Sequence, residues 1–341
     1  MGLLGRLFGA GGTDRPAEDP RLQQVLARVL EMHSRLRLAP RCEARLAAAM
    51  APALAHIGEL VAGVPRAHLA NTAAWSTDPY VRAYFAAPAD IDQVLARSRA
   101  LHDYFEANAG AGSAYAVMGM TMTERNTLGV AQVDGQTRSD VPHTTLGFSD
   151  HLIRVCGADE AGLREEVTQR MMDQIAIEGL AKVAADTSLR EDLEQEQALL
   201  ATRLRLLERQ GAGLRGMVGT DASGDPGEIA RVRAEAEQTE ERLKALGPRS
   251  EVLSRQLDTL CDAFAKADEL LQVSSLQRRV DRMNVVVQHG VGSEAESQVL
   301  EFRVARVPGN PPQQRALAIL QVLRADLPRA ANLLDNADPL L

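Results

Sequence analysis

Residues 229–271 read IARVRAEAEQTEERLKALGPRSEVLSRQLDTLCDAFAKADELL and keep one heptad register from end to end. Apolar and small residues recur there at alternating steps of three and four, a spacing that keeps one face of a helix toward a partner helix. These positions are Ile229, Val232, Ala236, Thr239, Leu243, Leu246, Ser250, Leu253, Leu257, Leu260, Phe264, Ala267 and Leu271. The stretch therefore predicts one arm of a long coiled coil.

A second heptad stripe lies upstream in the same chain. It consists of Leu193, Leu200, Leu207 and Leu214, with Leu189 and Leu204 as flanking candidates. The segment between the two stripes, residues 211–227, is rich in glycine and contains Pro226, which is typical of a turn between helices. We therefore expect an antiparallel coiled-coil hairpin over residues 159–273, with its tip near residues 211–227. Pairing of each arm with a second chain is the alternative.

The seam of this hairpin is expected to be made by leucines and one phenylalanine from both stripes. They are Leu193, Leu200, Leu207, Leu243, Leu246, Leu253, Leu257, Leu260 and Phe264. Gly247-Pro248 interrupts the second arm, and we expect a kink there because proline cannot donate a helical hydrogen bond. Asp186, Thr187 and Ser188 are candidates for a matching irregularity in the first arm.

Helical patterns also precede the hairpin. Three apolar faces at helical spacing, beginning at Leu22, Leu46 and Ile91, predict an N-terminal helical block over residues 19–108. Four aromatic residues, Trp75, Tyr80, Tyr84 and Phe85, fall close together within it. We expect them to pack at a junction between helices and sheet; a ligand pocket is the alternative.

Residues 113–156 and 277–307 alternate between apolar and polar positions, which predicts a small antiparallel sheet with the hairpin inserted between its strands. Met118, Met120 and Met122 share one strand face. Core packing is the favoured interpretation of this stripe, and a flexible binding groove is the alternative.

Leucines at helical spacing after two prolines predict a C-terminal helix over residues 311–327, followed by a tail at residues 328–341. These leucines are Leu317, Leu320, Leu323 and Leu327. The predicted class is therefore α+β and mostly helical. The low aromatic content of 3%, beside 45% hydrophobic residues, suits the packing of leucine and alanine between helices.

Charge and cysteine content narrow the function. A formal net charge of −8 argues against a general nucleic-acid-binding protein, which needs a basic surface, so no nucleic acid is expected as a partner. The three cysteines form no zinc or disulfide pattern, which favours reduced thiols and a cytoplasmic location. Neither a membrane span nor a signal peptide is predicted.

The N-terminus, residues 1–18, is expected to be flexible or amphipathic. Leu3, Leu4, Leu7 and Phe8 fall on one helical face and could contact a partner or the inner surface of the membrane, which would make the protein peripheral there. A frayed terminus with a short hydrophobic contact is the favoured alternative.

Signatures of catalysis are weak. Only Lys182, Lys244 and Lys266 are present and none follows a glycine, which excludes a Walker A phosphate loop. Asp140, His143, Asp150 and His151 form the densest polar cluster, and carboxylates with imidazoles suit a metal site or an acid/base pair; His289 could join them. Their spacing matches no defined metal motif, so capping of strand ends is favoured. No metal or cofactor is expected.

A cluster of arginines near the hairpin tip could meet an acidic partner. It consists of Arg203, Arg205, Arg209 and Arg215. Neutralisation by Asp221, Asp225 and Glu228 across the tip is favoured. The preferred prediction is a non-enzymatic interaction or scaffold protein that binds a protein partner, or itself, through the arm. A metal-dependent or acid/base enzyme with the Asp140 to His151 cluster is the alternative.

Overall fold

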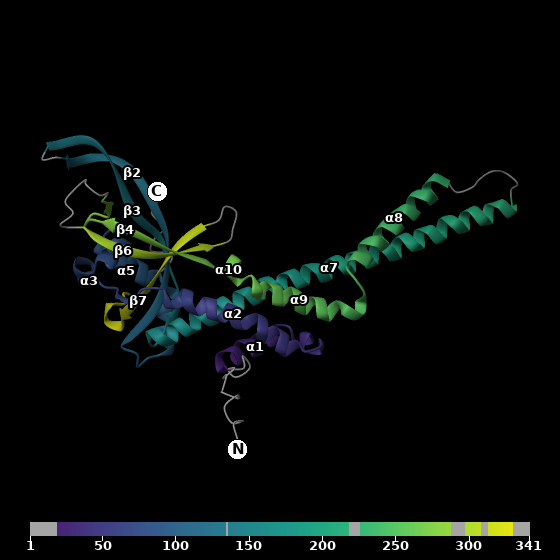
Figure 1. The fold of residues 1–341 in the computed structure, drawn as a ribbon, viewed down its shortest axis with the longest axis horizontal. Helices are drawn as coiled ribbons and strands as arrows, with labels where there is room; N and C mark the ends of the chain where they lie inside the picture. The colour runs from purple at the N-terminus through teal and green to yellow at the C-terminus, as the bar shows by residue number, and fades with distance from the viewer. Residues whose placement is uncertain (1–18, 134–135, 218–225, 288–296, 308–312, 330–341) are drawn as a thin grey trace, which may run out of the picture. The chain divides into compact units, whose positions relative to one another are not determined.

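The computed structural model shows two compact units (Figure 1). Unit 1 comprises Met1–Ala53 and Asp173–Lys266, and unit 2 comprises Leu54–Met172 and Ala267–Leu341. The residues that the structure describes are 19–133, 136–217, 226–287, 297–307 and 313–329. Long helices form unit 1 and a sheet with shorter helices forms unit 2, so the predicted α+β, mostly helical class is confirmed.

Unit 1 is built from helices. In chain order they are α1 (Pro20–Met32), the 3₁₀ helix η2 (Ser34–Leu38), α2 (Cys42–Ala62), α7 (Glu160–Met217), α8 (Pro226–Ala245), the 3₁₀ helix η3 (Arg249–Glu251) and α9 (Val252–Ala265). The end of α2 and the start of α7 belong to unit 2. Asp19 caps α1 because its carboxylate accepts the N–H of Arg21 at 2.9 Å, and Pro20 takes the first helical position.

The helices α1 and α2 pack against the hairpin helices within unit 1. Arg28 of α1 forms an ion pair with Asp173 of α7, and Arg45 of α2 forms one with Asp258 of α9. The predicted helical block over residues 19–108 is therefore divided, with its first part in unit 1 and the rest in unit 2. Helical spacing identifies a buried face but not the element that covers it, and this is why the sequence suggested one block.

Unit 2 contains a seven-stranded sheet. Its strands are β1 (His68–Leu69), β2 (Ser113–Val133), β3 (Gln136–Gly157), β4 (Gln272–Val280), β5 (Val285–Val286), β6 (Gln298–Val307) and β7 (Gln313–Leu323). The order is β1-β7-β2-β3-β5-β4-β6, and β6 also pairs with β7, so the pairings close into a ring. Only the pair of β1 and β7 is parallel among these strands. Helices α7 to α9 lie between β3 and β4 in sequence, as predicted.

The predicted C-terminal helix over residues 311–327 is wrong. Strand β7 occupies most of it, followed by the 3₁₀ helix η5 (Arg324–Asp326). The leucines fall at helical spacing, but the residues that are fully buried alternate along a strand; they are Ala316, Ala318, Leu320 and Val322, each at most 2% exposed. A strand that is apolar on both faces lacks the polar alternation that distinguishes it from a helix. Of the predicted tail, residues 330–341 lie outside the described residues.

Unit 2 also contains short helices, four between β1 and β2 in sequence and one directly before β4. They are α3 (Thr72–Thr77), α4 (Pro79–Tyr84), α5 (Pro88–Arg97), α6 (Arg99–Ala107) and α10 (Ala267–Leu270). Asp78 caps α4 by accepting the N–H of Tyr80 at 2.8 Å. Ser98 separates α5 from α6 and caps the latter by accepting the N–H of Leu101.

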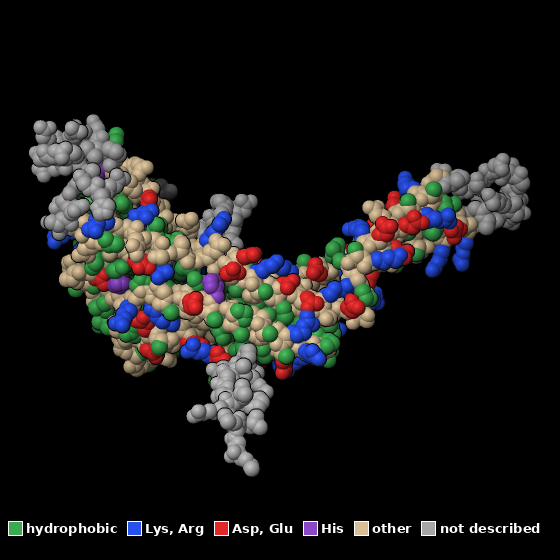
Figure 2. Space-filling view, in the orientation of Figure 1, with side chains coloured by type: hydrophobic (Ala, Val, Ile, Leu, Met, Phe, Trp, Pro, Cys, Tyr) green, Lys and Arg blue, Asp and Glu red, His purple; other side chains and the backbone are tan. Residues whose placement is uncertain are grey.

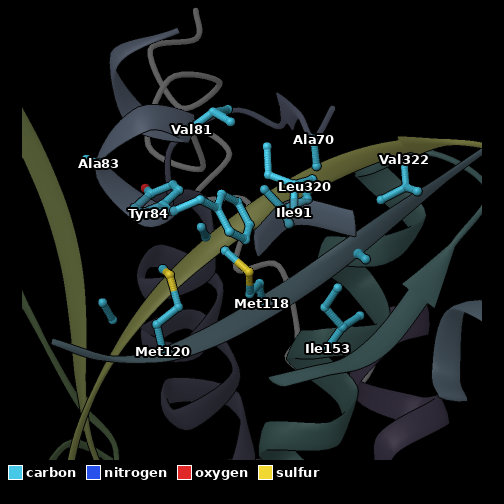
Figure 3. Packing of buried hydrophobic residues seen from close by; sticks show 14 of the residues in the cluster. Ala70, Val81, Ala83, Tyr84, Ile91, Met118, Met120, Ile153, Leu320 and Val322 are labelled. Atoms are coloured by element: carbon cyan, nitrogen blue, oxygen red, sulfur yellow. The ribbon is translucent and has the colours of Figure 1, made fainter. Parts of the chain in front are cut away.

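The core of unit 2 lies between the sheet and these helices. Figure 3 shows Met118 and Met120 of β2 beside Tyr84 of α4 and Ile91 of α5. Both methionine side chains are fully buried, so the methionine stripe packs in the core as favoured by the sequence. Tyr84 also contacts Phe302 of β6, with ring centroids 6.1 Å apart. The aromatic segment therefore lies at a junction of helices and sheet, as predicted.

Candidate interaction site: the helical hairpin

The seam residues predicted from the heptads line the inner side of the hairpin helices. Five of them are buried and four are half-buried: Leu193, Leu200, Leu257, Leu260 and Phe264 belong to the first group, and Leu207, Leu243, Leu246 and Leu253 to the second. Val232 and Thr239 of α8 are buried too, at 0% and 3% exposure. Leu189 lies off the seam, because 41% of it is exposed. The seam is thus covered by other parts of the same chain.

Contacts across the seam run in opposite directions along α7 and its partner helices. A methyl group added to Gly179 would lie 2.8 Å from Cδ1 of Leu260, so glycine permits close packing at one end. At the other end, Arg203 and Glu228 form an ion pair at 2.6 Å. Between them along α7 lie Thr187 with Gln256, Glu194 with Arg249 and Glu196 with Arg242, and Glu208 pairs with Arg233 slightly beyond Arg203. The helices therefore form an antiparallel hairpin within one chain.

The start and the outer end of the hairpin differ slightly from the prediction. Asp159 accepts the N–H of Gly162 at 2.8 Å, so α7 begins with a side-chain cap. It then continues to Met217, through part of the glycine-rich segment assigned to the tip, and α8 already begins at Pro226. A glycine inside a helix costs about 1 kcal/mol relative to alanine, which a long helix tolerates. Residues 218–225 lie outside the described residues.

A break in the second arm occurs at the predicted position. Helix α8 ends at Ala245, and Gly247 has a φ of 73°, in the left-handed region that glycine adopts without strain. Arg190 of α7 donates hydrogen bonds to the carbonyl oxygens of Leu246 at 2.8 Å and of Gly247 at 2.7 Å. These bonds satisfy carbonyls that the interrupted helix leaves unpaired. Helix α7 itself continues without a break, so the expected irregularity at residues 186–188 is not formed.

A groove of about 320 Å³ lies at this break. Its charged lining residues are Asp186, Arg190, Arg255, Asp258 and Asp262. The guanidinium of Arg255 donates to the carbonyl of Pro248 at 3.0 Å, so both arginines hold the backbone of the break. The groove is therefore part of the joint between α8 and α9.

The outer face of α7 carries two exposed leucines that the heptad interpretation missed. Leu199 is 70% exposed and Leu206 is 55% exposed. They are seven residues apart, so they lie on one face of the helix, away from the buried seam residue Leu200. Their spacing is visible in the sequence, but leucine is frequent along α7. The exposed leucines can therefore be distinguished from the seam leucines only once the seam is known.

The arginine cluster near the tip is partly neutralised, as favoured by the sequence. Arg203 pairs with Glu228, whereas the side chains of Arg215, Asp221 and Asp225 lie outside the described residues. Figure 2 shows basic and acidic side chains interspersed over α8 and the adjoining part of α7. This stretch of the hairpin is a charged, solvent-exposed surface.

Strand β3 spreads out the polar cluster proposed as an alternative enzyme site. His143 pairs with Thr127 in the ladder, eight residues before His151, and eight strand residues span about 26 Å. Asp150 accepts a hydrogen bond from the hydroxyl of Thr121 at 3.0 Å. The side chain of Asp140 and all of His289 lie outside the described residues. The structure therefore does not bring His143 next to Asp150 and His151.

His151 is held by the core of unit 2. Its imidazole stacks on Phe85 with ring centroids 5.0 Å apart, and its Nε2 lies 2.8 Å from the carbonyl oxygen of Tyr84. Burial lowers the pKa of His151, although the hydrogen bond to Tyr84 opposes this shift. Within the described residues, no group of three or more His, Cys, Asp or Glu side chains could hold a metal ion.

A half-buried histidine and aspartate pair was not predicted from the sequence. Nδ1 of His68 lies 2.7 Å from Oδ2 of Asp78, and the rings of His68 and Tyr80 are tilted by 32° with their centroids 4.6 Å apart. Burial opposes ionisation of Asp78, but the hydrogen bond and charge of His68, together with the backbone N–H groups of Tyr80 and Val81, lower its pKa overall. Nε2 of His68 is enclosed and has no hydrogen-bond partner among the described residues. A substrate could not reach it, so the pair joins β1 to the cap of α4.

The N-terminal residues proposed to contact a membrane or partner, Leu3, Leu4, Leu7 and Phe8, lie outside the described residues. None of the helices that the structure describes has the length and apolar composition needed to cross a bilayer.

No protein-family model matches this chain, and no curated protein and no solved structure is significantly similar to it. Its function is therefore inferred from its own residues.

Proposed function

We propose that this chain is a non-enzymatic interaction or scaffold protein whose helical hairpin acts as a coiled-coil arm. The arm binds a protein partner or a second copy of the chain. The observation that carries the proposal is the outer hairpin, defined here as residues 196–217 of α7 together with α8. Its seam is filled from within the chain, so its remaining faces are free to meet another molecule.

The contacts of the outer hairpin support this proposal. Three ion pairs join α7 to α8 there: Glu196 with Arg242, Arg203 with Glu228, and Glu208 with Arg233. Within unit 1, α8 runs alongside this part of α7 and away from α1 and α2 (Figure 1). An isolated helix pair buries little apolar surface for its length compared with a compact domain. Its contribution to stability is small, and its long surface is suited to recognition.

A cytoplasmic location is proposed from the thiols. Cys42, Cys156 and Cys261 are all within the described residues and all free. Burial raises the pKa of all three thiols, and that of Cys156 to about 11, so they are unreactive toward oxidants. Reduced, unreactive thiols favour a reducing compartment. A weak contact with the inner membrane surface through Leu3, Leu4, Leu7 and Phe8 is retained as part of the proposal.

A shortened arm tests the proposal. Residues 197–241 are removed and residue 196 is joined to residue 242 by a short glycine-serine linker. These two residues lie opposite each other in the hairpin, since Nη1 of Arg242 is 3.9 Å from Oε2 of Glu196. We expect the shortened protein to lose the association that the full chain shows, whether with a copurifying partner or with itself. Trp75 in unit 2 should keep its native fluorescence, which controls for folding. Unchanged association in the shortened protein would contradict the proposal.

The enzyme alternative has its own test. The variant Asp140→Ala with His143→Ala removes two candidate ligands, and loss of two ligands normally collapses metal affinity. Under our proposal, this variant keeps the association of the full chain. Stoichiometric metal in the unmodified protein, lost in the variant, would favour the enzyme instead.

A further inference from the structure

The outer face of α7 carries an apolar stripe that the hairpin itself does not use. Leu199 and Leu206 are 70% and 55% exposed, and two helical turns separate them, about 10.5 Å along the axis. Single exposed leucines are ordinary, but two on one helix face form a stripe of the kind that seats a second helix. Thr202 lies between them, and its hydroxyl already donates to the carbonyl of Ala198 at 2.9 Å. Covering this threonine would therefore leave no unpaired donor.

Charges along α7 sort by sign on either side of the stripe. Glu191 and Asp192 lie before Leu199, whereas Arg205 and Arg209 lie on either side of Leu206. All four side chains are exposed. Within the described part of the chain, none of these four has an ion-pair partner. Other charges of the same stretch, such as Glu194 and Arg203, are paired with η3 or α8. The unpaired charges therefore form an acidic end and a basic end.

We propose that a second copy of this chain binds the outer face of α7 in antiparallel orientation, about a two-fold axis near Thr202. This proposal rests on the arm function proposed above and names its partner. In this arrangement Leu199 of one copy lies near Leu206 of the other, and each acidic end faces a basic end. A parallel arrangement would place like charges opposite each other, which is unfavourable. A two-fold axis makes the contact self-complementary and closed.

Removal of the leucines is the first test. The variant Leu199→Asp with Leu206→Asp should weaken the dimer by more than about tenfold, measured by sedimentation velocity over a range of concentrations. The control, Leu38→Asp with Ile177→Asp, adds the same charge at two exposed apolar sites of unit 1, which are 75% and 51% exposed. It should leave the dimer intact. Both variants should melt like the unmodified protein, since these side chains are exposed.

Charge reversal is the second test. One variant carries Glu191→Arg with Asp192→Arg, and the other carries Arg205→Glu with Arg209→Glu. Each alone presents like charges along the whole antiparallel contact and should be monomeric where the unmodified protein is dimeric. An equal mixture should associate again, because the basic variant faces the acidic one. Parallel pairing instead predicts that neither variant is weaker than the unmodified protein, and this result would overturn the proposal.

Cysteine cross-linking fixes the orientation. Thr202→Cys lies near the proposed axis and should form a disulfide with its copy, above the level seen with the three native cysteines. Ser188→Cys lies 14 residues earlier, about 21 Å along the helix, and should not cross-link in an antiparallel pair. Cross-linking of both would indicate a parallel pair and overturn the proposal.

Self-association and the arm function can fail separately. The full chain could stay monomeric at all concentrations and yet lose a copurifying partner when residues 197–241 are removed. This result would overturn the proposed self-association and leave the arm function standing. A monomeric protein whose associations are unaffected by that deletion overturns both.

Discussion

Unit 1 and unit 2 bury their apolar side chains in different ways. In unit 2, Phe302, Met118 and Met120 are at most 1% exposed in a core that lies between the sheet and the short helices. In the outer hairpin, the buried positions form a single line, such as Leu200 and Val232, flanked by exposed ion pairs. The comparison teaches that a compact core depends on enclosed area, whereas a hairpin depends on helices that keep one line of buried residues in register, even across the break between α8 and α9.

The largest effect is expected from breaking a hairpin helix. Leu257 of α9 is fully buried, and Leu257→Pro removes a helical hydrogen bond at about 3 kcal/mol or more, in addition to the lost leucine packing. Far-ultraviolet circular dichroism should show a large loss of helix. Trp75 fluorescence, which reports unit 2, should change little.

A reciprocal variant controls for this prediction. Phe302→Ala removes a core aromatic of unit 2 and should cost about 3–5 kcal/mol in the free energy of unfolding followed by Trp75. If Leu257→Pro abolished the native Trp75 signal together with the helix signal, the contrast between the two units would be wrong.

A pH dependence is expected from unit 2 and not from the hairpin seam. Since burial lowers the pKa of His151, the unfolded chain binds a proton more readily than the folded one below the ordinary histidine pKa of about 6.5. The stability of unit 2 should therefore fall as the pH drops from about 7 to about 5, a range that spans the ordinary histidine pKa. His151→Leu should reduce this slope. An unchanged slope in the variant would show that His151 is not its source.

The smallest effect is expected from the ion pairs of the outer hairpin. Glu228→Gln breaks the pair with Arg203, whose side chain is 48% exposed, and such pairs contribute about 0.2–1 kcal/mol. The loss of helix stability should disappear at high salt, where the pair is screened anyway. Phe302→Ala serves as the salt-insensitive comparison. A large effect that persisted in salt would mean that the outer hairpin is held by ion pairs more than by its seam.

The sequence predicted the parts of the fold that depend on nearby residues or on a regular repeat. The heptad steps identified Leu200 and Leu257 as seam residues, and Gly247-Pro248 marked the break in the second arm, because backbone chemistry alone dictates it. Alternation located the start of β2 and the end of β3 to within a residue.

Non-local contacts account for what the sequence could not predict. Strand β7 pairs with β1, β2 and β6, and these partners keep it extended although Leu317, Leu320 and Leu323 fall at helical spacing. The candidate site was likewise only half predictable. The inner seam follows from the heptads, but the exposed stripe of Leu199 and Leu206 becomes recognisable only once the other face of α7 is known to be covered.

The central claim is that α7 and α8 pair within one chain and so leave their outer faces free. Arg203→Cys with Glu228→Cys, placed in a chain whose native cysteines are replaced, can be treated with a short bis-maleimide cross-linker. We expect a cross-link within single chains, and none in the control Arg203→Cys with Lys266→Cys, whose second cysteine lies at the opposite end of the hairpin. A cross-link found only between chains would contradict the intramolecular hairpin.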